Sequence, residues 1–150
     1  MIYVNRELTS GGGNIGLLVA KMFYGAFEGN VILYDPYLRS LDTWHSIIPP
    51  THLQLVTDMD ELLSGADTVT IHVPLTPATE NMIGAEQFKM MKPSAILINT
   101  ARGGIVDEQA LAEALRTEEI FAAGLDAFAS EPPTLSQYPE LCQSDRVLLL

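Results

Sequence analysis

Cysteine is almost missing from this sequence, because Cys142 is the single one. An internal disulfide and a cysteine-based metal cluster are therefore excluded for these 150 residues. Basic side chains are also few: eight Lys and Arg stand against 19 Asp and Glu, which gives a net charge of −11. This balance argues against nucleic acid or an anionic membrane surface as a partner.

Long apolar runs are absent as well. No stretch approaches the length of a membrane span, and the start, residues 1–5, is too short for the apolar part of a signal peptide. With 47% hydrophobic and 18% charged residues, the chain has the composition of an ordinary globular domain with a sizeable core. We therefore expect one domain over residues 1–150, located in the cytoplasm and without membrane contact.

A glycine-rich motif stands near the N-terminus. Gly11, Gly13 and Gly16 fit the pattern G-x-G-x-x-G, and a helical pattern follows at once. Asp35 comes directly after a predicted strand over residues 31–34 and lies 19 residues after Gly16. An acid at about this distance of 20 residues binds the ribose hydroxyls of a dinucleotide, whose pyrophosphate rests on the helix N-terminus. The apolar face predicted for the helix comprises Ile15, Leu18, Val19, Met22 and Phe23.

The strand that should precede this motif is poorly placed. Residues 2–4 have the composition of a strand, but six residues, 5–10, separate them from Gly11. We therefore expect the first strand to be incomplete, with most of it deleted between Ser10 and Gly11.

A second candidate for a functional segment runs from Ala95 to Asp107. An apolar run predicts a buried strand, which breaks into a turn containing Arg102, Gly103 and Gly104. The planar guanidinium of an arginine can bind a carboxylate with two parallel hydrogen bonds. The alternative is a loop arginine that pairs with a nearby acid of the chain.

The rest of the chain alternates strands with helices, which predicts an α/β fold with a doubly wound parallel sheet. Further strands are expected at 53–56, 68–73, 121–125 and 146–150, and further helices at 58–65, 85–91 and 107–117, the last capped by Asp107. Four segments with polar residues lie at the ends of predicted strands: Asp35, His72–Pro74, Thr100–Arg102 and Asp126–Glu131. We expect these four segments to lie along one rim of the sheet, where cofactors bind.

With these motifs assembled, the chain resembles the nucleotide-binding domain of the NAD-dependent D-isomer-specific 2-hydroxyacid dehydrogenases, in their phosphoglycerate dehydrogenase-like branch. The similarity is most specific in residues 72–77, 91–107 and 124–126, and in Glu131-Pro132. It implies a Rossmann-type sheet, NAD as cofactor and a small D-2-hydroxy acid or 2-keto acid as substrate. In relatives this domain supplies the dimer contact, so a homodimer is also expected.

The resemblance also implies roles for individual residues. Arg102 would bind the substrate carboxylate and contact the cofactor, and Glu131 would pair with a catalytic histidine and raise its pKa. Asp35, without an arginine beside it, favours NAD over NADP because it repels a 2′-phosphate. The implied cofactor-binding residues are Gly11, Gly13, Asn14, Ile15 and Gly16 at the pyrophosphate, Asp35 at the ribose, Val73, Pro74 and Thr79 at the adenine, and Thr100, Ala101 and Asp126 at the nicotinamide.

The sequence departs from this family at two places. The family histidine follows the last strand in a Pro-His pair, and the sequence ends at Leu150, just before that position. His72 matches a position on the cofactor side and cannot replace it. The substrate-binding domain is absent too, so we expect a fragment, a splice form or a defective gene model that has no turnover alone.

Other functions fit the sequence less well. A non-catalytic module that senses NAD(H) or binds a protein partner is the main alternative, and a product that folds poorly is a third. His45 and His52 lie in a proline-bearing loop without the spacing of metal ligands, so no metal site is expected. Glu131 could merely shape a turn, and Asp126 could merely cap a loop.

Overall fold

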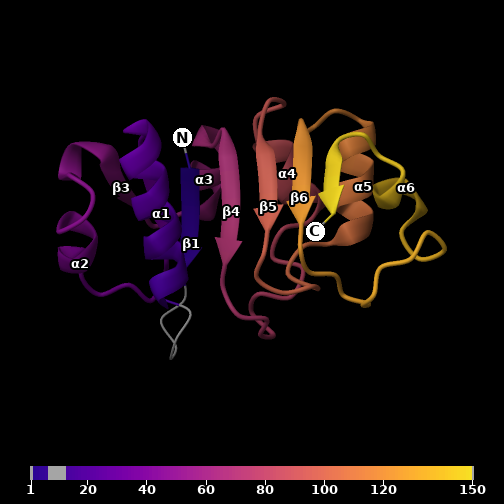
Figure 1. Cartoon of the computed structure of the whole chain (residues 1–150), viewed down its shortest axis with the longest axis horizontal. Coiled ribbons are helices and arrows are strands. Elements are labelled where there is room, and N and C mark those ends of the chain that lie inside the picture. Colours follow the sequence, from indigo (N-terminus) through magenta and orange to yellow (C-terminus); the bar gives the residue numbers. More distant parts are fainter. Residues whose placement is uncertain (1, 7–12, 150) are drawn as a thin grey trace.

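The computed structural model describes residues 2–6 and 13–149, and its centre is a seven-stranded parallel sheet in the order β3-β2-β1-β4-β5-β6-β7 (Figure 1). This order, with the chain running outward in both directions from β1 and β4, is that of a doubly wound sheet, as the alternation of elements predicts. The strands are β1 (Ile2–Arg6), β2 (Val31–Tyr34), β3 (Leu53–Val56), β4 (Thr68–His72), β5 (Ile96–Asn99), β6 (Ala122–Leu125) and β7 (Val147–Leu149).

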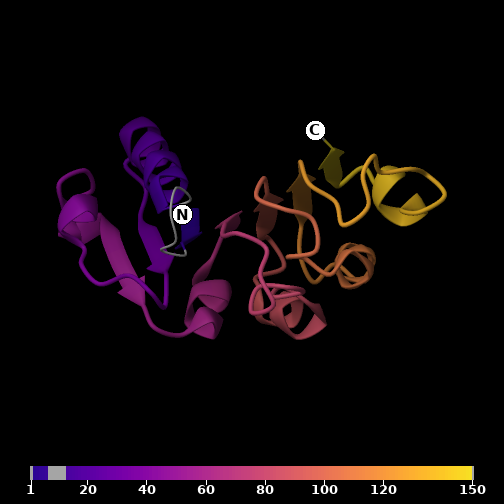
Figure 2. The same ribbon diagram turned by 90° about the horizontal axis from the view of Figure 1, so that it is seen from below.

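Helices connect these strands and lie on both sides of the sheet. Figure 2 shows α1 on one side and α3, α4 and α5 on the other, whereas α2 lies beside β3 and α6 beside β7. The helices are α1 (Gly13–Phe27), α2 (Asp42–His45), α3 (Met59–Gly65), α4 (Ala85–Met90), α5 (Glu108–Arg116) and α6 (Pro139–Cys142), with a 3-10 turn η1 (Pro50–His52).

The first strand corrects one expectation. β1 has five residues, is as long as β4, and pairs in parallel with both β2 and β4 at the middle of the sheet. The expectation of an incomplete first strand is therefore wrong for this part of the chain. The residues between β1 and α1 lie outside the described residues, and Gly11 is among them.

Cap residues in the sequence predicted where two of the helices begin. Asp58 caps α3 by accepting a hydrogen bond from the Asp60 N–H (3.0 Å), and Asp107 caps α5 by accepting from Gln109 and Ala110 (both 3.0 Å). Such side-chain acceptors satisfy amide groups that a helix start leaves without partners. The segment 36–51, for which no helix or strand was predicted, contains α2, whose Trp44 is fully buried.

Two hydrophobic cores lie on the two sides of the sheet. The larger one packs α3, α4 and α5 against β4, β5 and β6, with Phe88, Leu97 and Leu111 fully buried. The smaller one packs α1 and α2 against β2 and β3.

The orientation of α1 differs from the prediction. Leu17 and Ala20 face the sheet and are 7% and 0% exposed, whereas Ile15, Leu18 and Met22 of the predicted apolar face are 53%, 53% and 65% exposed. The sequence carries apolar residues on both sides of this helix, so periodicity alone chose the wrong side.

Candidate functional site

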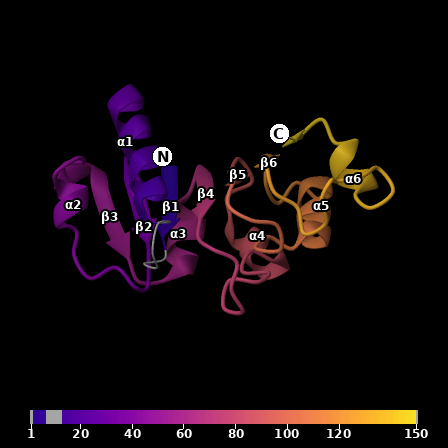
Figure 3. The ribbon, with the colours of Figure 1, turned by 60° about the horizontal axis from the view of Figure 1, so that its bottom comes forward.

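The carboxyl ends of the strands form a common rim, which comes forward in Figure 3. β2, β4, β5 and β6 end at Tyr34, His72, Asn99 and Leu125, so the four predicted segments lie at the ends of four parallel strands. The prediction of one shared rim is therefore confirmed. Gly13, Asn14, Ile15 and Gly16 form the first turn of α1, which follows the rim end of β1.

Asp35 is the buried carboxylate of this rim. It is 5% exposed, and its Oδ1 accepts a hydrogen bond from the Tyr37 N–H (2.9 Å) while its carbonyl accepts from the Leu38 N–H (3.2 Å). The side chain is thus held by the turn that follows β2. A fixed carboxylate at the end of β2, the strand that pairs with β1, fits the ribose end of a dinucleotide.

A compact turn follows β4. Val73 is buried, and Thr79 closes the turn because its hydroxyl donates to the Pro74 carbonyl (2.7 Å) and accepts from the Thr76 N–H (2.8 Å). Thr79 is 7% exposed, and its hydroxyl forms its hydrogen bonds within the turn. Thr79 therefore shapes the predicted adenine side through the backbone of residues 74–79.

His72 ends β4 and is 7% exposed. Its Nε2 lies 3.0 Å from the Thr70 Oγ1, and burial lowers the pKa of the imidazole from its usual 6.5 to about 4. The ring is therefore neutral at pH 7. A general acid for a reaction at neutral pH needs a pKa near that pH, so His72 does not suit that task.

Asn99, the last residue of β5, holds the turn that contains Arg102. It is 1% exposed, its Nδ2 donates to the Arg102 carbonyl (2.9 Å), and its Oδ1 accepts from the Ala101 N–H (3.1 Å). Beyond the turn, the Ile83 N–H donates to the Ile105 carbonyl (3.2 Å) and the Asp107 N–H donates to Ile83 (2.9 Å). The turn is thus fixed at both of its ends.

Arg102 itself is exposed at the rim. Its Nη1 donates to the carbonyl of Ala101 (2.6 Å), and among the described residues it forms no ion pair with a carboxylate. The alternative of a loop arginine neutralised by a nearby acid therefore finds no support in this part of the chain. Thr100, beside it, is also exposed, and Ala101 is half-buried.

The loop that contains Glu131 follows β6. Its first residue, Asp126, is exposed, and the Asp126 N–H donates to the Asn99 carbonyl (3.0 Å). Three successive backbone N–H groups of the loop then donate to side chains: Phe128 to Glu131 Oε1 (3.1 Å), Ala129 to Glu108 Oε1 (2.7 Å), and Ser130 to the Tyr138 hydroxyl (3.1 Å). Glu131 thus remains exposed while one of its oxygens is held by its own loop.

Gly103 brings these two rim segments into contact. A Cβ atom at this position would collide with the carbonyl group of Phe128 and the nitrogen of Ala129. Only a residue without a side chain lets the Arg102 turn approach the Glu131 loop this closely. Gly104, the next residue, has φ +79°, a left-handed conformation that favours glycine.

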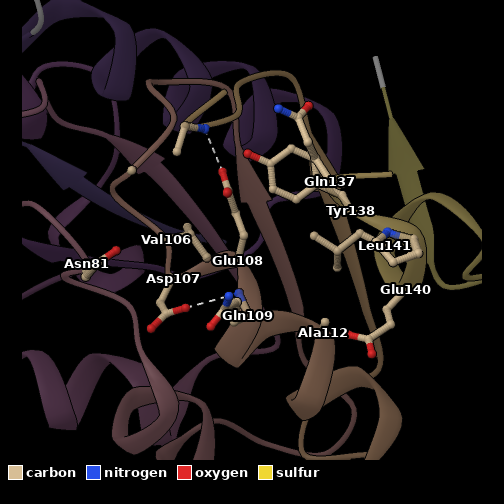
Figure 4. Close-up of a pocket in the computed structure, with 13 residues that line it drawn as sticks. Asn81, Val106, Asp107, Glu108, Gln109, Ala112, Gln137, Tyr138, Glu140 and Leu141 are labelled. Atoms are coloured by element: carbon tan, nitrogen blue, oxygen red, sulfur yellow. Dashed lines mark hydrogen bonds between the residues drawn. The ribbon is translucent and has the colours of Figure 1, made fainter. Parts of the chain in front are cut away.

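A cavity of about 460 Å³ borders both segments and is drawn in Figure 4. Gly104 and Ala129 line it, together with residues at the start of α5 and around α6. Two of its acidic side chains already serve the protein, because Asp107 caps α5 and Glu108 accepts from Ala129. The cavity is therefore part of the scaffold of the Glu131 loop.

Sequence reasoning missed the residues that position this rim. These are Asn99, Gly103, Glu108 and Tyr138. An asparagine at a strand end is a signal that could have been used, since such side chains bond to nearby backbone. Glu108 and Tyr138 are 21 and 8 residues away from the amides they accept from, and no local pattern indicates such contacts.

The rim fits NAD in its donors and acceptors. The start of the 15-residue helix α1 suits an anionic pyrophosphate, and Asp35 suits a ribose diol at the end of the neighbouring strand β2. Among the described residues, no three His, Cys, Asp or Glu side chains are grouped so that they could hold a metal ion.

Comparisons with known proteins agree with this geometry. Residues 5–150 match the family model described as D-isomer specific 2-hydroxyacid dehydrogenase, NAD binding domain. The chain is 47% identical over 121 residues to a D-3-phosphoglycerate dehydrogenase of Methanocaldococcus jannaschii, covering 81% of this chain and 22% of that protein. It is 40% identical over 138 residues to a hydroxypyruvate reductase of Thermotoga maritima, covering 92% and 42%.

Solved structures give the same result. A D-isomer specific 2-hydroxyacid dehydrogenase from Lactobacillus delbrueckii ssp. bulgaricus in its NAD complexed form matches with a TM-score of 0.79 and 38% identity, over 99% of this chain and 44% of that one. D-lactate dehydrogenase with NAD+ from Lactobacillus jensenii matches with a TM-score of 0.80 and 35% identity, over 99% and 44%. The chain thus spans less than half the length of these proteins. It belongs to the D-isomer-specific 2-hydroxyacid dehydrogenase family and corresponds to the NAD-binding domain of its members.

Proposed function

We propose that this chain binds NAD(H) along the rim and serves the transfer of a hydride between NAD(H) and a small D-2-hydroxy acid or 2-keto acid. The observation that carries the proposal is the contact at Gly103, which packs the Arg102 turn against the Glu131 loop. Two turns that follow neighbouring strands thus carry an exposed cation and an exposed carboxylate on the same rim of the sheet.

Each of these side chains has a distinct task in the proposal. Arg102 binds the substrate carboxylate and polarises the neighbouring carbonyl, since its guanidinium is exposed and pairs with no described acid. Glu131 holds a histidine, supplied by sequence outside this chain, in its protonated form, because a carboxylate at hydrogen-bonding distance raises the pKa of an imidazole. Bound NADH supplies the hydride.

Asp35 sets the choice of cofactor in this proposal. A buried carboxylate at the ribose hydroxyls would repel the 2′-phosphate of NADP(H), so NAD(H) binds more tightly. Asp35→Asn keeps an oxygen for the Tyr37 N–H and removes the charge. We expect this variant to narrow the preference by about tenfold or more, which corresponds to about 1.4 kcal/mol.

Fluorescence titration of the purified chain with NADH and with NADPH tests this part. Asp67→Asn is the matched control, because Asp67 lies before β4 at the other end of the sheet and pairs with Lys92 there (2.8 Å). Equal or tighter binding of NADPH by the unchanged protein would contradict the proposal.

A non-catalytic role for this chain taken alone is the second candidate. The sequence has three histidines: His72 is buried and neutral, and His45 and His52 lie in α2 and η1. Loss of general acid catalysis alone costs roughly 10² to 10⁴ in rate. We therefore expect NADH binding without measurable oxidation of NADH when hydroxypyruvate, glyoxylate, pyruvate or 2-oxoglutarate is added.

This second candidate has a direct test. Turnover by the chain alone that disappears in Arg102→Ala would show that another group donates the proton.

As to location, no helix among the described residues is long and apolar enough to cross a membrane. A cytoplasmic location stays a prediction.

A further inference from the structure

The segment between β4 and α4 lies between two parts of the rim that have different tasks in the proposed function. In the sheet order, β1 and β4 separate β2, which Asp35 follows, from β5, which the Arg102 turn follows. We expect a dinucleotide that lies across the ends of these strands, with its pyrophosphate at α1, to contact the segment that follows β4. We name residues 73–84 the β4–α4 linker.

The first half of this linker is a closed turn. The N–H groups of Thr79 and Glu80 both donate to the Thr76 carbonyl (3.0 and 2.9 Å), and the Met82 N–H donates to the Thr79 carbonyl (3.3 Å). The Thr79 hydroxyl also donates to the Pro74 carbonyl (2.7 Å). Because these hydrogen bonds share the same few residues, we expect the turn to open and close as one unit.

The second half of the linker is bonded to the turn that follows β5. The Asn81 N–H donates to the Gly104 carbonyl (2.8 Å). Ile83 is 2% exposed and bonds twice, because it donates to the Ile105 carbonyl (3.2 Å) and accepts from the Asp107 N–H (2.9 Å). The two segments thus form a short parallel bridge, which opens only if they separate.

Asn81 is the junction between the closed turn and this bridge. Its φ is +49°, a left-handed conformation in which asparagine is enriched and a β-branched residue is an outlier. Its side chain is exposed and lines the cavity drawn in Figure 4, so a larger side chain has room there. The backbone conformation, and not the space around the side chain, therefore restricts which residue fits at this position.

We propose that Asn81 is a positioning residue that couples the nucleotide side of the rim to the Arg102 turn. A nucleotide that binds against the closed turn keeps it closed, and through the backbone of Asn81 the bridge stays closed as well. Two segments that open together are both stabilised by a ligand that binds only the closed form. The inference rests on the proposed binding of NAD(H) and adds how that binding reaches Arg102.

ADP tests the coupling, because it carries adenine, ribose and pyrophosphate but no nicotinamide. Amide hydrogen exchange, resolved by NMR in the unchanged chain, reports opening of the closed turn at Thr79 and opening of the bridge at Asp107. At a free ADP concentration of about ten times its dissociation constant, exchange at both amides should slow about tenfold. The Thr117 amide, at the far end of α5, is the internal control and should change by less than about twofold.

Variants of Asn81 test the junction itself. Asn81→Val forces a β-branched residue into the left-handed conformation, so the response of Asp107 to ADP should fall below about threefold while Thr79 keeps its response. Asn81→Gly adopts this conformation freely and should keep both responses. Glu28→Val is the matched control, because Glu28 is also left-handed (φ +50°) and exposed but lies between α1 and β2 at the other end of the sheet. It should keep both responses.

Three results would overturn the proposal and leave the proposed function intact: ADP that slows exchange at Thr79 but not at Asp107, a full response of Asp107 in Asn81→Val, or an equal loss of that response in Glu28→Val. Circular dichroism checks the fold of each variant, and the unchanged chain tests the coupling without any of them. Failure of ADP to bind at all would contradict the proposed function, and this proposal with it.

Discussion

The two turns that meet at Gly103 are held by different chemistry. The Arg102 turn depends on Asn99, a neutral side chain that is 1% exposed and bonds to the backbone on both sides of the turn. The Glu131 loop depends on groups that ionise, namely the carboxylates of Glu108 and Glu131 and the phenol of Tyr138. We therefore expect the hydrogen bonds of the Arg102 turn to be insensitive to pH and those of the Glu131 loop to depend on it.

This difference matches the task that we propose for each segment. A substrate anchor has to keep one position at all times, and buried neutral hydrogen bonds give the backbone that rigidity. A carboxylate that works with a histidine has to respond to protonation. Hydrogen bonds from surrounding N–H groups hold such a loop most strongly while its carboxylates are ionised.

Replacement of Asn99 should cause the largest loss in the free energy of unfolding, and it should disturb the Arg102 turn without changing the contacts of the Glu131 loop. Asn99→Leu keeps the volume but leaves the Ala101 N–H and the Arg102 carbonyl without partners in a part-buried place. Each lost partner costs about 1 to 3 kcal/mol, so we expect a loss of about 2 to 5 kcal/mol in the free energy of unfolding. Urea denaturation measures it, and a loss below about 1 kcal/mol would contradict the rigidity assigned to this turn.

Replacement of Gly103 should separate the two turns and have the next largest effect. In Gly103→Ala the new methyl group meets the backbone at Phe128 and Ala129, which cannot move aside without moving the loop. We expect a loss of about 1 to 3 kcal/mol, together with faster amide exchange at residues 128–130. Gly124→Ala is the matched control, because its Cβ has open space, and it should be close to neutral. Equal effects of the two variants would refute the close contact.

The comparison also shows what the sequence reveals about such a site. The fold, the shared rim and the positions of Asp35, Arg102 and Glu131 follow from strand ends, cap residues and glycines, which are local signals. Asp107 is an example: an acid before an apolar helical pattern predicted a cap, and the structure has that cap.

Long-range partners could not be predicted in this way. Glu108 reads as a first-turn helix residue and Tyr138 as a loop aromatic, yet both bond to the Glu131 loop. The buried side of α1 was misassigned for a related reason, since both sides are apolar and only the packing of Leu17 and Ala20 decides between them. The length of the first strand was misjudged because spacing to a motif says little about pairing with β2 and β4.

A change of pH also alters the free energy of unfolding of the whole domain through His72. This effect has to be separated from the pH response of the Glu131 loop. Burial lowers the pKa of His72 in the folded state to about 4, so the unfolded chain binds the extra proton between pH 6.5 and 4. Stability is therefore greatest above pH 6.5 and falls as the pH drops toward 4, by at most about 1.4 kcal/mol per pH unit. His72→Gln should flatten this slope in urea denaturation series, and an unchanged slope would contradict the neutral buried ring.

The smallest expected effect concerns Tyr138 and Glu108, the two ionisable side chains that accept hydrogen bonds from the Glu131 loop. Burial raises the pKa of the Tyr138 phenol above its usual value of 10, and the charge of Glu108 raises it further, while the hydrogen bond from Ser130 lowers it. Because the folded-state pKa is raised, the stability that the neutral Tyr138 phenol contributes is complete below pH 10 and is lost as the pH rises through the folded-state pKa, since burial and the charge of Glu108 disfavour the phenolate. The loop should therefore loosen in alkali while the Arg102 turn does not.

Glu108→Gln isolates this contribution, since the amide oxygen can still accept from the Ala129 N–H while the charge is gone. We expect the pKa of Tyr138 to move back toward 10 and the free energy of unfolding to fall by about 1 kcal/mol or less. Absorbance titration of tyrosinate measures the pKa, with Tyr138→Phe to identify its share among the five tyrosines. Glu140→Gln removes an exposed charge from the same cavity as a control. If both glutamate variants shift the pKa of Tyr138 equally, Glu108 acts only through the overall negative charge of the cavity. The specific role assigned to Glu108 in supporting the Glu131 loop would then be wrong.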